Sequence, residues 1–155
     1  MYSSLLVLRR EDSSREVNKY ALSDDSFIMQ RAEYIDQELP VKKQLIDWLK
    51  KVYDSALTVG KDKNGYYIMF TEETRKNVAS LVLKEIEKLV LDAKERQNQG
   101  KPYSIDFHYI DWALPNGQNH ALVYCEYGMT LCQFILNIGK PCAKYYIEKV
   151  YSYHC

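Results

Sequence analysis

Apolar residues recur at helical spacing in two stretches of the chain. From Pro40 to Leu57 they share one face, and the proline suits a first helical turn. From Thr71 to Gln97 the spacing is more regular, the threonine can cap the helix, and the two glutamates after it oppose the helix dipole. The apolar stripe of this second helix comprises Val78, Leu81, Val82, Ile86, Leu89, Val90 and Ala93. Leu83 and Leu91 lie off the stripe, so the pattern predicts a long helix covered on two sides, either central in the fold or against a partner.

Three shorter stretches of the N-terminal part also indicate elements. The apolar run Leu5 to Leu8 predicts a strand, and the turn residues Asn64 and Gly65 precede an aromatic, β-branched run, Tyr66 to Phe70, that predicts another. The stretch Asp24 to Gln37 is ambiguous, but its apolar spacing favours a helix.

The period changes after Pro102. Apolar and polar residues alternate from Tyr103 to Tyr109, turn residues follow at 115–117, and an apolar run begins near His120, which together predict an antiparallel hairpin over 103–127. The stretch 128–141 predicts a short buried helix that stops at a glycine and a proline. Tyrosine and β-branched residues from Tyr145 to Tyr153 favour a strand at an edge or at the end of the chain.

These elements predict the fold class. We expect an α+β protein in which two or three main helices pack on a small, mainly antiparallel sheet. The length fits one domain over residues 1–155, with a helical part at about 24–99 and a hairpin and strand part at about 103–155.

Charge and hydropathy narrow the function classes. Lysine plus arginine equals aspartate plus glutamate at 21 each, which argues against nucleic acid as a partner because nonspecific binding needs a cationic surplus. The apolar runs are far shorter than the ~20 residues of a membrane span. The N-terminal segment places its apolar run before its arginines, the reverse of a secretory signal, so we expect a cytoplasmic protein without a membrane partner.

The four cysteines do not follow the spacing of a metal site. Cys125, Cys132, Cys142 and Cys155 are separated by six, nine and twelve residues, whereas structural zinc sites place two ligands two to four residues apart. We therefore expect reduced thiols, no metal and no cofactor.

One cluster could support acid–base chemistry. Asp106 and His108 share a face of the predicted hairpin, and His120 and Glu126 lie on the facing strand. The alternative is that these residues form the solvent face of an amphipathic strand. The common nucleotide-binding and hydrolase signatures do not occur.

The chain contains 14 tyrosines, an excess over average composition. In the last strand, Val150 favours an inward row that includes Tyr146 and an outward row that would bind a partner: Tyr145, Lys149, Tyr151 and Tyr153. The alternative is that the pairing register is reversed and the tyrosine row faces the core.

The sequence favours a small cytoplasmic, non-catalytic binding protein that acts by contact with another protein, of the inhibitor, immunity or anti-defence type. The alternative is a small hydrolase that uses the Asp106, His108, His120 and Glu126 cluster. A third hypothesis is tyrosine-mediated binding of a small ligand or of single-stranded nucleic acid.

Overall fold

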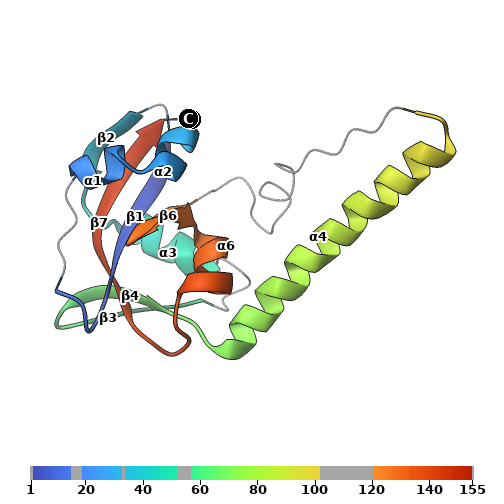
Figure 1. Ribbon diagram of the computed structural model, residues 1–155. Coiled ribbons are helices and arrows are strands. Elements are labelled where there is room, and N and C mark those ends of the chain that lie inside the picture. The colour runs from blue at the N-terminus through green and yellow to red at the C-terminus, as the bar shows by residue number, and fades with distance from the viewer. Residues whose placement is uncertain (1, 15–18, 33, 52–56, 102–120, 155) are drawn as a thin grey trace.

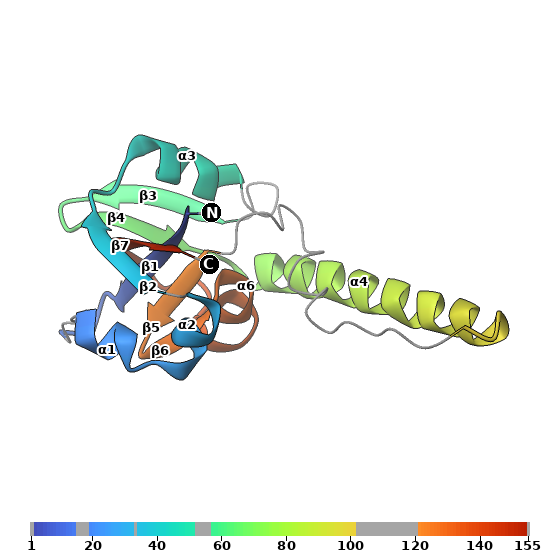
Figure 2. The same cartoon turned by 90° about the horizontal axis from the view of Figure 1, so that it is seen from above.

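The computed structural model describes residues 2–14, 19–32, 34–51, 57–101 and 121–154. Within them, seven strands form one sheet, shown in Figures 1 and 2. The strands are β1 (Tyr2–Arg10), β2 (Tyr34–Leu39), β3 (Thr58–Asp62), β4 (Gly65–Met69), β5 (Leu122–Cys125), β6 (Tyr127–Thr130) and β7 (Tyr145–His154). The helices are α1 (Lys19–Ser23), α2 (Ser26–Arg31), α3 (Lys43–Lys51), α4 (Glu72–Asn98), α6 (Leu131–Gln133) and the π-helix η2 (Phe134–Ile138).

The sheet is mainly antiparallel, so the predicted α+β class is confirmed. Its strand order is β3-β4-β7-β1-β5-β6, and β2 also pairs with β7. Strands β1 and β5 pair in parallel, and the other described pairs are antiparallel. Strands from both ends of the chain thus share one sheet.

Strand β7 is central. It pairs with β1 along its length, with β4 near its start and with β2 toward its end. The prediction of a strand at 145–153 is therefore confirmed; of its two alternatives, the edge of the sheet is wrong, and β7 is the last described strand along the chain. Apolar side chains cover both faces of β7, so tyrosine serves here as a large core residue.

Two hydrophobic cores lie on opposite faces of the sheet. Helices α3, α6 and η2 and the first turns of α4 pack on the first core, which includes Leu6, Ile68, Phe134 and Ile147. Helices α1 and α2 pack on the second core, which includes Leu5, Leu22, Ile28 and Tyr124. Figure 2 shows α1 and α2 apart from α3 on either side of the strands.

The expected outward row of tyrosines is buried. Tyr145, Tyr151 and Tyr153 are 3%, 4% and 2% exposed. The pairing of β7 with β1 shifts between Val7 and Leu8, which leaves Glu148 without a partner in the register. This β-bulge breaks the two-residue alternation, so that Tyr145 lies in the first core and Tyr151 and Tyr153 in the second. The outward orientation predicted from the sequence is wrong.

The prediction of a single helix over 24–37 is also wrong. Helix α2 ends at Arg31, and β2 begins at Tyr34 and pairs with β7. Ile35 is buried in the second core. Tertiary pairing with β7 thus overrides a spacing that is compatible with a helix.

Other predicted elements are confirmed with changed limits. The strand after Asn64 and Gly65 is β4, and its hairpin partner β3 was not predicted. Helix α3 spans a shorter range than the predicted Pro40–Leu57, and part of that range, 52–56, lies outside the described residues. The long helix is confirmed as α4, and the strand at the end of the predicted hairpin is β5.

Most of the predicted 103–127 hairpin, residues 103–120, lies outside the described residues. Strand β5 pairs with β1 and with β6, and a single residue, Glu126, with a positive φ of 76°, connects β5 to β6. The predicted buried helix begins after β6, at Leu131, and Gly139 follows its end as expected.

Candidate protein-contact surface on helix α4

The N-terminus of α4 is fixed by local hydrogen bonds. The Thr71 side chain accepts from the Thr74 backbone N–H at 3.2 Å, and the Thr74 hydroxyl accepts from the Thr71 N–H at 3.3 Å. Glu72 and Glu73 add negative charge at the positive end of the helix dipole. The sequence therefore sets where α4 begins.

The first turns of α4 are anchored to η2 and to the end of β4. The Arg75 Nε donates to the backbone oxygen of Ile135 at 3.0 Å, and its Nη2 donates to the oxygen of Gly139. The guanidinium also lies 5.6 Å from the ring centroid of Phe70, and Val78 is buried in the first core. These contacts fix the direction in which the helix leaves the sheet.

Beyond Val82, α4 projects away from the sheet. Figures 1 and 2 show the helix extending well past the strands in both views. All of α4 is described, and its buried residues are Thr74 and Val78. At 27 residues the helix is about 40 Å long. The half-buried Leu81 and Val82 also pack on the first core, and among the described residues no side chain of α4 beyond Val82 belongs to either core.

The projecting part carries an exposed apolar stripe. Leu83, Ile86 and Val90 are 63%, 38% and 47% exposed. With the half-buried Ala79 and Ala93 they follow a spacing of three and four residues, and we call these five residues the α4 stripe. Leu91, on another side of the helix, is also exposed. The sequence left open whether the long helix is central or meets a partner, and in the described structure it is not central.

The position of Leu83 on the helix leaves it free of the core. Thr74 faces the core, and Leu83 follows it by nine residues, which is half a turn plus two full turns of an α-helix. Leu83 therefore lies on the opposite side of the helix from the packed side.

The C-terminal end of α4 is closed by a glycine. Gly100 has a positive φ of 66°, its N–H donates to the oxygen of Gln97, and the Lys101 N–H donates to the oxygen of Arg96, each at 3.0 Å. This geometry ends the helix and turns the chain.

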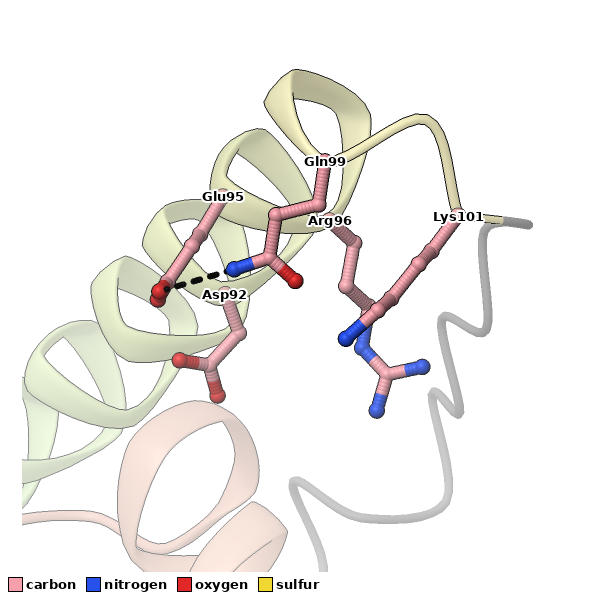
Figure 3. Close-up of a pocket in the computed structure, with 5 residues that line it drawn as sticks. All are labelled: Asp92, Glu95, Arg96, Gln99 and Lys101. Carbon is pink, nitrogen blue, oxygen red and sulfur yellow. Dashed lines mark hydrogen bonds between the residues drawn. The ribbon is translucent and has the colours of Figure 1, made fainter.

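An open hollow of about 410 Å³ lies at this end (Figure 3). Its lining comprises Asp92, Glu95, Arg96, Gln99 and Lys101. These side chains are exposed, and Gln99 donates to Glu95 at 3.3 Å. A hollow of exposed polar groups on one helix end lacks the apolar lining typical of ligand sites.

A polar network lies on the sheet away from α4. The carboxylate of Asp62 accepts from the Lys144 Nζ and the Tyr146 hydroxyl, each at 2.9 Å. The hydrogen bond from Lys144, followed by that from the Asn64 N–H, lowers the pKa of Asp62 to about 2. The Lys144 Nζ also lies 4.6 Å from the ring centroid of Tyr67. These groups satisfy one another, so the network ties β3 to β7.

The described residues do not test the predicted hydrolase cluster. Asp106, His108 and His120 lie outside the described residues, and Glu126 is exposed at the tip of the β5–β6 hairpin. The hydrolase hypothesis thus remains a prediction.

The predicted binding row is not a surface. Tyr145, Tyr151 and Tyr153 are core residues, and Lys149 is half-buried, with its Nζ 4.0 Å from a carboxylate oxygen of Glu38 on β2. The surface that projects is the α4 stripe, and the sequence signal for it was the apolar residues on more than one side of the predicted helix.

The described cysteines differ in exposure. Cys132 is buried, Cys125 is half-buried and Cys142 is exposed. Burial raises the pKa of the Cys125 thiol. In the part of the chain that the structure describes, no group of three or more His, Cys, Asp or Glu side chains could hold a metal ion.

No protein-family model matches the chain, and neither curated proteins nor solved structures show a match. Among the described residues, every helix is too short or too polar to span a bilayer. The interpretation of the α4 stripe therefore rests on its own geometry.

Proposed function

We propose that the protein is a small cytoplasmic, non-catalytic binding protein that acts by contact with another protein, of the inhibitor, immunity or anti-defence type, and that the α4 stripe is its contact surface. The observation that supports this is the exposure of Leu83, Ile86 and Val90 on a helix that projects beyond both cores.

Covering the stripe would release substantial free energy. Fully burying one Val, Leu or Ile side chain is worth roughly 1.5–3 kcal/mol. The three large stripe residues retain between 38% and 63% exposure, so each contributes about 1 kcal/mol on contact. Such residues, at the centre of a helix face and surrounded by polar groups, have the usual arrangement of an interface core and rim.

The chemistry of the partner follows from the surroundings of the stripe. The exposed side chains beside it include both Lys84 and Glu87, and the whole chain is neutral. A partner surface should therefore be an apolar groove or helix face without strong net charge.

The test compares a stripe variant with a matched variant on the same helix. Full-length protein carrying Ile86→Lys and Val90→Lys, and separately Leu91→Ser, is used as bait in the native host, with bound proteins quantified by mass spectrometry. Because all three side chains are exposed, the melting temperatures of both variants should match that of the wild type.

We expect the stripe variant to lose a partner that Leu91→Ser retains. Equal recovery of every bound protein by the two variants, with both still folded, would exclude the stripe as the contact surface.

A further inference from the structure

The charges beside the α4 stripe have opposite signs one heptad apart. Leu83, Ile86, Val90 and Ala93 follow the spacing of a coiled-coil seam. Directly after Ile86 comes Glu87, and directly after Ala93 comes Lys94, both exposed. The two charged residues therefore occupy equivalent positions on one flank of the seam.

We propose that the outer part of the α4 stripe, from Ile86 to Ala93, binds a second copy of this chain, with the two α4 helices antiparallel. The inference rests on the proposed function, because it names the occupant of that same contact surface. In an antiparallel pair with its two-fold axis beside residues 91 and 92, Val90 lies against Ala93 of the second copy. The same register places Glu87 opposite Lys94 of the second copy, twice by symmetry.

Antiparallel pairing is favoured over parallel pairing by charge. In a parallel pair, Glu87 and Lys94 would face Val82 and Leu89, the apolar residues on the other flank, and no opposite charges would meet. In an antiparallel pair, the positive end of each helix dipole also lies toward the negative end of the other, which is electrostatically favourable.

Antiparallel pairing also keeps the two sheets apart. The projecting part, from Leu83 to Asn98, is about 24 Å long, so each sheet would sit near the free end of the other helix. The neutral charge of the chain adds no long-range repulsion between copies.

The expected association is modest. In this register the two helices overlap from residue 85 to residue 98, about four turns, and bury much less than the ~1,600 Å² of a standard interface. We therefore expect a dissociation constant on the order of 10 µM.

The test is a charge swap measured by sedimentation equilibrium of the full chain. Wild-type protein should shift from 18.2 kDa toward twice that mass as its concentration rises. Glu87→Lys and Lys94→Glu should each weaken association about tenfold, because each places like charges opposite one another twice. The double variant should restore wild-type association, while Lys88→Glu, which makes the same change of net charge on the side of the helix away from the seam, should not weaken it.

The possible results separate this inference from the proposed function. A monomer at every concentration would refute the second copy, while the proposed function would stand if Ile86→Lys with Val90→Lys still loses a captured partner. A dimer that the charge swap does not rescue, or that none of these variants weakens, would place the contact elsewhere and also overturn the inference. In another result, the double charge variant restores the dimer while Ile86→Lys with Val90→Lys captures the same other proteins as the wild type. That result would support a second copy as the occupant of the stripe and would exclude a different partner there.

Discussion

Asp25 joins helix α2 to the edge strand β6, and its removal should destabilise the protein. One carboxylate oxygen accepts from the Ile28 N–H at 3.0 Å, and the other accepts from the Gly128 N–H at 2.7 Å. The first bond caps α2, and the second holds a strand more than a hundred positions later in the chain. Asp25→Ala breaks both.

The magnitude follows from these two bonds. Loss of an N-cap costs about 1 kcal/mol. Loss of a hydrogen bond to a charged group costs about 1.5–3 kcal/mol, and the N–H of the buried Gly128 would be left without this acceptor. We expect a total of about 3 kcal/mol, or a fall in melting temperature of about 6–12 °C for a chain of this size.

The assay is urea unfolding of the full chain, followed by a thermal melt. Asp24→Ala is the matched control, because Asp24 is an exposed neighbouring aspartate and its removal should cost less than about 0.5 kcal/mol. Gly128→Ala should also destabilise, since a Cβ there would lie 2.5 Å from Asp25 Oδ1. If Asp25→Ala unfolds at the same urea concentration as Asp24→Ala, the bridge between α2 and β6 contributes nothing and the reasoning fails.

Three further predictions test the rest of the described structure. Tyr151→Ala and Tyr153→Ala should each lower the free energy of unfolding in urea by about 3 kcal/mol or more, because both rings lie in the second core. An unchanged free energy of unfolding would show that these rings lie on the surface. The lowered pKa of Asp62 means that its ion pair stabilises the fold above its ordinary pKa of 3.8 and that this stability is lost as the pH falls toward 2. Asp62→Asn should therefore flatten the pH dependence of the melting temperature in that window, and a profile identical to the wild type would contradict the network. In a Cys155→Ser background, a thiol reagent should label the exposed Cys142 well before the half-buried Cys125, whose pKa burial raises; the reverse order in mass spectra would show that β5 opens readily.

The elements whose signals are local were readable from residue type and spacing alone. Helix α4 begins where Thr71 can cap it and ends where Gly100 can adopt a positive φ, and both features were readable from residue type. The two-residue turn before β4 and the strand character of 145–153 were likewise readable. These elements depend on hydrogen bonds and backbone preferences within a few residues.

Which residues cover each face of a strand or helix depends instead on long-range packing. The alternation in β7 could not reveal the bulge at Glu148, because that bulge arises from its pairing with β1, at the other end of the chain. Nor could it show that β7 is central, since tyrosine is compatible with both a core and a surface. Ile35 lies in a strand because it pairs with Tyr153 on β7, a residue far away in the sequence.

For the α4 stripe, too, some features were readable from the sequence and others depend on packing. The apolar spacing of α4 was visible in the sequence, and so was the excess of leucines off its main stripe. Whether Leu83 and Val90 would be covered depended on the direction of the helix, which Arg75 and Val78 fix through contacts with η2 and the first core. The spacing of apolar residues shows that a helix face is apolar, but long-range packing determines whether other parts of the chain bury that face.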